Sequence, residues 1–133
     1  MLTGTSYTSG SFVGVNGITW NYTGARNESG FEIDGNGILF RDSGSYVRAT
    51  IPGGVNEVSV DYRKGFTGGG NRQLEIRVNG EVVATSPSFG SASGRDDTIN
   101  TLSVDTLGLT GDVVVEIRTI TNNQIVFDNI TWN

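Results

Sequence analysis

Apolar and polar residues alternate along this chain in short runs, and clusters of Gly, Asn, Asp and Ser separate one run from the next. Alternation with a period of two is typical of β-strands with one buried face, and no stretch shows the spacing of an amphipathic helix. The pattern therefore predicts an all-β sandwich or barrel. The predicted strands are Ile18–Thr23, Gly37–Arg41, Tyr46–Ile51, Glu57–Lys64, Arg72–Asn79, Glu81–Thr85, Thr98–Asp105, Asp112–Ile120 and Gln124–Trp132.

The fourth and fifth of these strands flank a glycine-rich loop, so we expect them to pair as a hairpin. Charge selects the register. Placing Arg63 opposite Glu75 and Asp61 opposite Arg77 makes two opposite-charge pairs, each worth a few tenths of a kcal/mol to about one. The other register would put Asp61 beside Glu75, and these two like charges would repel. We therefore predict the register in which Arg63 lies opposite Glu75.

Composition narrows the function. The chain has 133 residues, enough for one domain, with a net charge of -5 and neither His nor Cys. This excludes Cys and His nucleophiles, Ser-His-Asp triads and Cys-containing zinc sites. The acidic balance disfavours a general nucleic-acid surface. No apolar run approaches the roughly 20 residues that a membrane helix needs.

The segment from Arg63 to Gln73 is a basic spot on this acidic chain. If Arg63 pairs with Glu75, the other polar and aromatic side chains of the segment remain for an anionic or hydroxyl-rich ligand. The candidate contacts are Lys64, Phe66, Asn71, Arg72 and Gln73. A flexible hairpin tip is the alternative interpretation of this loop.

A second candidate surface lies on the strand Tyr46–Ile51. Alternation puts Tyr46 and Arg48 on the solvent side, where a sugar or anion site can form. Arg41 is a further candidate contact, and Arg118 is expected to pair with Glu116 two residues before it. The sequence leaves open whether these arginines converge. Aromatic residues elsewhere, Trp20, Tyr22 and Trp132 among them, are expected in the core rather than on a sugar-stacking platform.

Acidic residues suggest a cation site. Glu32, Asp34 and Asn36 alternate and Gly37 follows, as at the start of a calcium loop. The closing Glu of such a loop is missing, with Ser43 at that spacing. The alternative is a polar turn.

The adjacent pair Asp96-Asp97 sits at the end of a segment, Ser86–Asp97, that we expect to be a long surface loop. Glycosidase chemistry needs two carboxylates at a defined separation across a cleft, and nothing in the pattern specifies one. The chain is therefore not expected to be an enzyme.

The closing strand carries a family resemblance. In Gln124–Trp132 an apolar pair precedes Asp128, and an apolar-polar-aromatic triplet ends the strand. This is similar to the closing strand of galactose-binding-like β-jelly rolls, which include many carbohydrate-binding modules of secreted bacterial enzymes. Four further segments resemble a bacterial module appended to extracellular nucleases and other secreted enzymes: Ile18–Tyr22, Ile33–Arg41, Gly65–Gln73 and Val78–Gly80.

The resemblance covers nearly the whole chain. It implies a β-sandwich jelly roll of about eight or nine antiparallel strands, with residues 1–133 forming a single module. It also implies a role for Asp128, because the Asp at this place in the family often joins a structural calcium site. Residues 1–27 contain no carboxylate to supply the usual N-terminal ligand.

These features predict a non-catalytic carbohydrate-binding module that tethers a secreted bacterial enzyme to a polysaccharide, with acidic and sulfated polysaccharides among the candidates. Two alternatives stay open: a nucleic-acid docking module of a secreted nuclease, and a structural or interaction domain without a small ligand. We expect an extracellular monomer that does not bind membranes, with calcium as a candidate cofactor. Met1 and Leu2 precede a stretch rich in Thr, Ser and Gly, so the chain is expected to be one module of a longer protein.

Overall fold

The computed structural model describes residues 6–27 and 32–133. Within these ranges the chain forms strands and one short 3-10 turn, η1 (Val15–Gly17), and contains no helix long and apolar enough to cross a membrane. The strands are β1 (Thr8–Val13), β2 (Thr19–Arg26), β3 (Ile38–Phe40), β4 (Tyr46–Ile51), β5 (Val58–Lys64), β6 (Leu74–Val78), β7 (Glu81–Thr85), β8 (Asn100–Val104), β9 (Val113–Thr119) and β10 (Ile125–Trp132).

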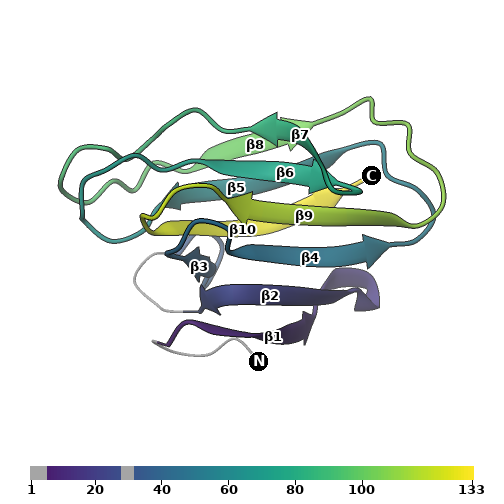
Figure 1. The fold of residues 1–133 in the computed structure, drawn as a ribbon, viewed down its shortest axis with the longest axis horizontal. Helices are drawn as coiled ribbons and strands as arrows, with labels where there is room; N and C mark the ends of the chain where they lie inside the picture. Colours follow the sequence, from purple (N-terminus) through teal and green to yellow (C-terminus); the bar gives the residue numbers. More distant parts are fainter. Residues whose placement is uncertain (1–5, 28–31) are drawn as a thin grey trace.

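The strands pair in the order β7-β6-β9-β4-β2-β3-β10-β5-β8, and β1 pairs with β2. This path folds into two layers: β7, β6, β9, β4, β2 and β1 form the front layer in Figure 1, and β8, β5, β10 and β3 lie behind it. The short strand β3 joins the layers, because it pairs with both β2 and β10. The result is an antiparallel β-jelly roll, as the sequence predicts.

The core lies between the layers and consists of every second residue of the long strands. In β9, Val113, Val115 and Ile117 are buried, and they face Val60 of β5 and Phe127 of β10 across one continuous apolar cluster. Aliphatic side chains dominate this cluster, and burying each one fully stabilises the fold by roughly 1.5–3 kcal/mol. The period-two pattern thus predicts the core-facing residues correctly.

All nine predicted strands are present, and two of them, β4 and β7, have the predicted bounds. The alternation pattern does not predict β1, because its residues are mostly Ser, Thr and Gly and carry little alternation. The predicted hairpin is wrong. β5 pairs with β10 and β8 in one layer, whereas β6 pairs with β7 and β9 in the other.

The charged residues of the predicted hairpin have other partners. Arg63 is buried at the end of β5, where its guanidinium contacts Asp97 and the backbone carbonyl of Glu32. Asp61 instead accepts hydrogen bonds from Thr101 and Asn129. Local charge cannot decide the register between strands that lie in different layers.

Candidate functional site

Lys64 and Arg72, here called the loop cations, do not present their charges to a ligand. Lys64 is 2% exposed, and its Nζ donates to the carbonyls of Ala92 at 2.5 Å and Gly94 at 2.7 Å. Arg72 is fully buried, and burial lowers the pKa of its guanidinium. The predicted role of the loop cations as direct ligand contacts is therefore wrong.

Arg72 instead ties three loops together. Its Nε donates to the carbonyl of Gln124 at 2.6 Å, and its terminal nitrogens donate to the carbonyls of Gly65, Gly70 and Gly90. These carbonyls belong to the segments after β5, after β7 and before β10. Because each buried carbonyl needs a donor, Arg72 stabilises this end of the sandwich from inside.

The remaining loop candidates are dispersed. Phe66 is half-buried with a positive φ of 56°, and the guanidinium of Arg26 lies 5.1 Å from its ring centroid. Gln73 donates through Nε2 to the carbonyl of Ser86, while Asn71 is exposed. Phe66, Asn71 and Gln73 stay predicted contacts, although their charged neighbours in the loop serve the scaffold.

The predicted calcium loop does not assemble as an alternating ligand set. Glu32 accepts a hydrogen bond from Arg63 through its backbone carbonyl, and the Asn36 side chain bonds Asn27. Packing explains the glycine at position 37, because a Cβ there would lie 2.5 Å from the side chain of Val126 in β10. The described residues contain no group of three or more acidic, His or Cys side chains that could hold a metal.

Asp34 and Asp128 nevertheless meet. The backbone N–H of Asp34 donates to Oδ2 of Asp128 at 3.3 Å, and Asp61 lies directly opposite Asp128 across the β10–β5 pair. Burial, with the charges of Asp34 and Asp61, raises the pKa of Asp128, although N–H groups of Asn129 and Asp34 act in the other direction. This corner of the sandwich is therefore unusually rich in negative charge.

The carboxylates of Asp96 and Asp97 support the loop before β8. Asp97 accepts hydrogen bonds from Arg63 and Arg95, and Asp96 accepts one from the backbone N–H of Thr98. These interactions hold the pKa of both carboxyls below the ordinary value. The pair therefore contributes to the structure of the loop before β8.

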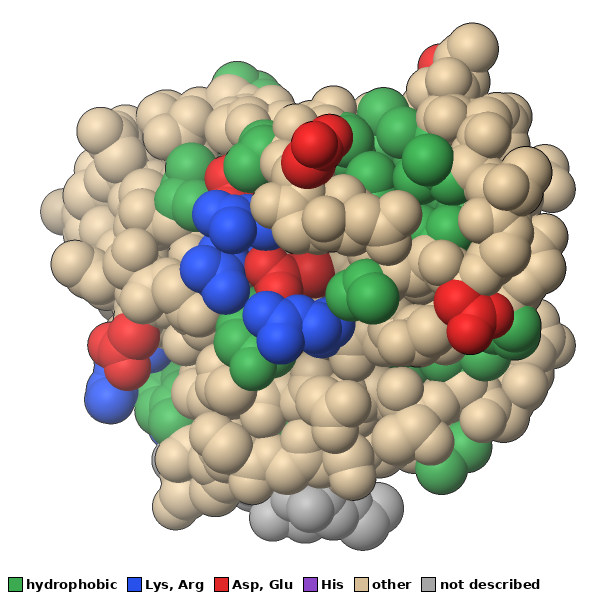
Figure 2. Space-filling model, turned by 45° about the vertical axis from the view of Figure 1, so that its right-hand side comes forward, with side chains coloured by type: hydrophobic (Ala, Val, Ile, Leu, Met, Phe, Trp, Pro, Cys, Tyr) green, Lys and Arg blue, Asp and Glu red, His purple; other side chains and the backbone are tan. Residues whose placement is uncertain are grey.

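Three arginines converge on the outer side of β4, β9 and β6. Arg48 of β4 and Arg77 of β6 lie opposite Glu116 of β9 from either side, and Arg118 lies between Tyr46 and Glu75 in the next row. Figure 2 shows the basic side chains gathered around acidic ones on this side of the molecule. We call this surface the arginine face; its members are Tyr46, Arg48, Glu75, Arg77, Glu116 and Arg118.

Ion pairs organise the arginine face. Arg48 contacts Glu116 through Nη2 at 2.6 Å and Nε at 2.7 Å, and Arg118 donates through Nε to the other oxygen of Glu116 at 2.9 Å. Arg77 donates to Glu75 at 2.6 Å. The expected pairing of Arg118 with Glu116 is confirmed, and Arg48 joins the same carboxylate.

Arg41 lies apart from this group. Its guanidinium contacts the neighbouring Asp42 at 3.4 Å and lies 4.4 Å from the ring centroid of Tyr7. Of the arginines suggested by the sequence, Arg48 and Arg118 therefore come together, Arg41 does not, and Arg77 is the member that the sequence analysis missed. The signal that the sequence lacks is the assignment of strands to layers, because the predicted hairpin places Arg77 opposite Asp61, whereas Arg77 lies opposite Glu116 of β9.

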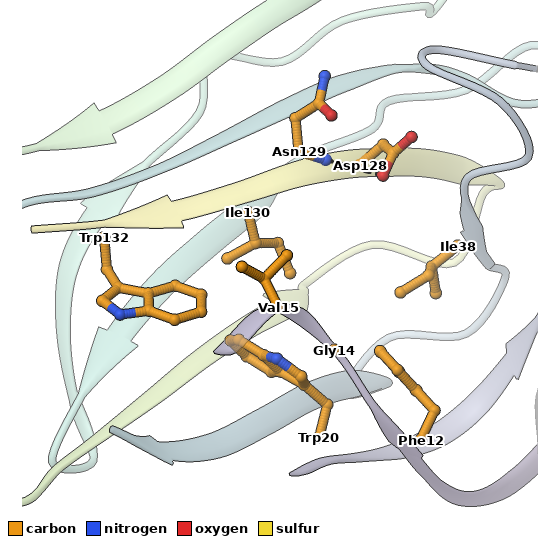
Figure 3. Close-up of a pocket in the computed structure, with 9 residues that line it drawn as sticks. All are labelled: Phe12, Gly14, Val15, Trp20, Ile38, Asp128, Asn129, Ile130 and Trp132. Atoms are coloured by element: carbon orange, nitrogen blue, oxygen red, sulfur yellow. Dashed lines mark hydrogen bonds between the residues drawn. The ribbon is translucent and has the colours of Figure 1, made fainter. Parts of the chain in front are cut away.

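A pocket opens at the side of the sandwich where β3 begins, next to Ile38. β10 pairs with β3 only from Ile125 to Phe127, so beyond that point β10 and the β1–β2 layer separate. The opening measures about 200 Å³ and is shown in Figure 3. We call it the aromatic pocket; its lining residues are Phe12, Gly14, Val15, Trp20, Ile38, Asp128, Asn129, Ile130 and Trp132.

Two tryptophans from opposite layers dominate the aromatic pocket. Trp20 of β2 and Trp132 of β10 have ring centroids 6.0 Å apart at an interplanar angle of 55°. Trp20 is almost fully buried, whereas Trp132 is only partly covered. Gly14 makes room for this arrangement, because a Cβ there would lie 3.1 Å from the Trp20 indole. The sequence predicts both tryptophans in the core, and Trp132 instead borders an opening.

A β-bulge builds the polar rim of the aromatic pocket. The register of β10 against β5 shifts between Asp128 and Thr131, and Asn129 adopts a positive φ of 53°. In Figure 3, Asp128 and Asn129 lie along one edge while Ile130 and Trp132 line the cavity. Bulges re-aim side chains, so this one places a carboxylate and a carboxamide beside an apolar cavity.

The sequence matches no protein-family model and none of the curated proteins. Solved structures do share its fold. A CBM36 carbohydrate-binding module in complex with calcium and xylotriose superposes with a TM-score of 0.60 and 14% identity, over 95% of this chain and 99% of that chain. A CBM35 module from Paenibacillus barcinonensis gives a TM-score of 0.60 and 21% identity, over 95% of this chain and 98% of its own.

A larger protein contains a similar domain. A family two carbohydrate esterase from Clostridium thermocellum, in complex with cellohexaose, matches 73% of this chain with a TM-score of 0.52 and 18% identity. This chain spans only 27% of the esterase. The chain therefore has the β-jelly-roll fold of carbohydrate-binding modules, and the resemblance identified in its sequence is confirmed at the level of fold.

Proposed function

We propose that this chain is a non-catalytic carbohydrate-binding module and that the aromatic pocket holds one sugar residue of a polysaccharide. The observation that carries the proposal is the combination of Trp20 and Trp132 with Asp128 and Asn129 around one opening. An apolar cavity with a few convergent polar groups and a perturbed carboxyl is the usual form of a ligand site.

The chemistry of the pocket suits a pyranose ring. A sugar ring has apolar C–H faces that pack on aromatic side chains, and its hydroxyl groups need acceptors and donors at the ring edge. Trp132 supplies the packing surface and the Asp128 carboxylate accepts. The Asn129 carboxamide, whose Nδ2 also donates to Asp61, contributes its oxygen and its second N–H. The volume lies below the roughly 300–1,000 Å³ of common ligand pockets, so a single residue of a longer chain fits best.

The fold relatives support this class of ligand. The CBM36 structure contains xylotriose and the esterase structure contains cellohexaose, both of them uncharged oligosaccharides. Binding of a polysaccharide at this pocket would tether an attached catalytic domain to its polymer outside the cell. Tethering, secretion and a bacterial source remain parts of the proposal.

Calcium enters the proposal through Asp34 and Asp128. The crowding of Asp34, Asp61 and Asp128 favours a bound cation, because a divalent ion would offset their mutual repulsion. The described residues contain no group of three acidic side chains that could hold a metal by themselves, so backbone carbonyls or water would supply the other oxygens. Calcium is then expected to raise the Tm and EDTA to reverse the effect, whereas an unchanged Tm would remove calcium from the proposal.

Affinity electrophoresis tests the proposal. Gels containing a neutral polysaccharide, hydroxyethylcellulose or arabinoxylan, are expected to retard the wild-type protein, and Trp132→Ala is expected to migrate freely. Val82→Ser is the control, because Val82 is an apolar side chain 49% exposed on β7, outside the pocket lining. Retardation by no polysaccharide in the panel, or equal retardation of Trp132→Ala, would contradict the proposal.

A further inference from the structure

We propose that the arginine face binds an anionic substituent of a glycan, a sulfate or a carboxylate group, as a site separate from the aromatic pocket. This inference takes from the proposed function only that the ligand is a polysaccharide. It goes beyond a neutral sugar site because it assigns a charge preference to a particular surface. Four features of the arginine face lead to it.

The charges of the arginine face are layered. The side chains of Glu75 and Glu116 are 7% and 6% exposed, whereas those of Arg48, Arg77 and Arg118 are 42%, 30% and 25% exposed. The arginines therefore cover the carboxylates, and a ligand approaching from solvent meets guanidinium groups first. Three cations over two anions also leave a local excess of positive charge on a chain whose net charge is -5.

Hydrogen-bond donors remain on the arginine face. Arg77 and Arg118 each use Nε toward a glutamate, and within the described residues their terminal nitrogens have no acceptor. Guanidinium groups donate two parallel N–H bonds to planar or tetrahedral oxyanions. The buried glutamates fix the arginine stems, so the outward donors are oriented before a ligand arrives, which lowers the entropy cost of binding.

An aromatic ring holds the guanidinium planes in place. The guanidinium carbon of Arg48 lies 4.2 Å from the ring centroid of Tyr46, and that of Arg118 lies 5.4 Å from it. Such contacts contribute about 0.5–1 kcal/mol at exposed sites. Tyr46 thereby orients two of the three cations, which is a positioning role.

The arginine face is also hollowed. A depression of about 440 Å³ lies among Arg48, Arg77 and Arg118, with Asn79 and Gly80 of the β6–β7 turn at its border. This is larger than the aromatic pocket and has room for a charged substituent with the ring that carries it. The depression therefore matches one substituted sugar residue.

An isolated cationic spot fits a substituent better than a nucleic-acid backbone. Nucleic-acid surfaces are usually basic over a whole face, so that several phosphates are neutralised together. Here the three arginines of the arginine face alternate with two glutamates on one small surface of an acidic protein. A nucleic acid is accordingly the alternative that the experiment must separate.

Dextran and dextran sulfate make a matched pair of probes, because they share a backbone and differ in charge. In affinity electrophoresis at low salt, dextran sulfate is expected to retard the wild-type protein and dextran is not. The double variant Arg48→Gln/Arg77→Gln is expected to lose at least tenfold in affinity. Arg95→Gln is the control for loss of charge away from the arginine face. It removes one positive charge, against two in the double variant, from a side chain 49% exposed in the loop before β8, and is expected to change affinity less than twofold.

Further arms decide the chemistry. Polygalacturonate in place of dextran sulfate distinguishes a carboxylate preference from a sulfate preference. The inference would be overturned if neither dextran sulfate nor polygalacturonate retards the protein. It would also be overturned if Arg95→Gln loses as much affinity as the double variant, or if single-stranded DNA binds more strongly than either glycan. If the double variant fails to fold, Arg48→Lys/Arg77→Lys keeps the charges but removes the paired donors of the planar guanidinium groups. A several-fold loss of dextran sulfate affinity is still expected.

The two proposals fail differently. Loss of dextran sulfate binding in the arginine variants with hydroxyethylcellulose binding intact supports both. Neutral binding without anion binding overturns only the arginine face, and anion binding without neutral binding overturns only the aromatic pocket.

Discussion

The aromatic pocket and the arginine face present opposite chemistry to a polysaccharide. In the pocket, two tryptophans and several aliphatic side chains surround one carboxylate and one carboxamide. On the face, three guanidinium groups cover two buried carboxylates. Apolar packing in the pocket is nearly independent of salt, whereas attraction to exposed guanidinium groups is screened by salt. Ionic strength therefore separates the two sites in one protein.

A second contrast concerns the arginines themselves. Arg72 and the arginines of the face are the same residue type, but Arg72 points into the sandwich and donates its hydrogen bonds to loop carbonyls. The period of two accounts for this difference, because Arg72 shares the inward parity of Leu74 and Ile76, while Arg77 has the outward parity. Cation identity alone says little about ligand binding until the face of the strand is known.

The largest expected effect comes from Arg72→Met. Removing a buried donor set leaves several carbonyls without partners, so we expect a loss of about 2–4 kcal/mol in the free energy of unfolding. Thermal denaturation measures this as a marked fall in Tm. Binding by the folded variant is expected to persist at both sites. A variant with normal Tm and abolished binding would return Arg72 to the ligand contacts.

Trp132→Ala is expected to weaken neutral-glycan binding at least tenfold, or about 1.4 kcal/mol, because the exposed aromatic surface of the pocket is lost. Trp132→Phe keeps an aromatic face and is expected to retain most of the affinity. Titration calorimetry with cellohexaose measures the difference. Dextran sulfate binding is expected to stay the same in both variants, and parallel losses at both sites would erase the distinction between them.

Glu116→Gln separates stability from affinity on the arginine face. The variant removes the carboxylate that Arg48 and Arg118 share, so the free energy of unfolding is expected to fall by about 1 kcal/mol. The same change frees guanidinium donors and increases the local positive charge, so dextran sulfate affinity is expected to rise several-fold. A fall in both quantities would show that Glu116 positions the arginines more than it neutralises them.

The smallest effect concerns Asp128 and pH. The pKa of Asp128 is raised in the folded state, first by burial, so protonation favours folding. Wild-type stability from this group is therefore present below the unfolded pKa, near 3.9, and is lost as pH rises through the higher folded pKa. Asp96 and Asp97 have lowered pKa values and act in the opposite direction. Comparison with Asp128→Asn isolates the Asp128 contribution.

The Tm of Asp128→Asn, relative to wild type, is expected to be highest near pH 7 and to decline toward pH 4. The variant should also bind neutral glycans a few-fold more weakly, because an amide oxygen is a poorer acceptor for sugar hydroxyls than a carboxylate. A pH-independent Tm difference would show that the carboxyl titrates normally.

The sequence predicts the strands and the core well because both follow from alternation that each strand carries by itself. It predicts pairing poorly, because the partner of β5 is β10, distant in the chain, and not the neighbouring β6. The arginine face was partly predictable, since parity places Tyr46 and Arg48 outward. Placing Arg77 on the same surface requires the order of the strands in the sheet, which alternation does not provide.

The aromatic pocket left one readable trace. In β10 the inward residues change parity from Ile125 and Phe127 to Ile130 and Trp132, with Asp128 and Asn129 adjacent between them. Two consecutive polar residues in an alternating strand indicate a bulge. What the sequence cannot give is the late start of β3 at Ile38, opposite Phe127, which leaves the space beside that bulge open.

The two tryptophans of the chain both line the aromatic pocket, so intrinsic tryptophan fluorescence reports directly on its occupancy. Titration of the wild-type protein with cellohexaose and xylotriose is predicted to give a saturable emission change that persists in 0.5 M NaCl, while dextran sulfate leaves the emission unchanged. Glycan binding measured by calorimetry without any change in tryptophan emission would contradict the central claim that the aromatic pocket holds the sugar.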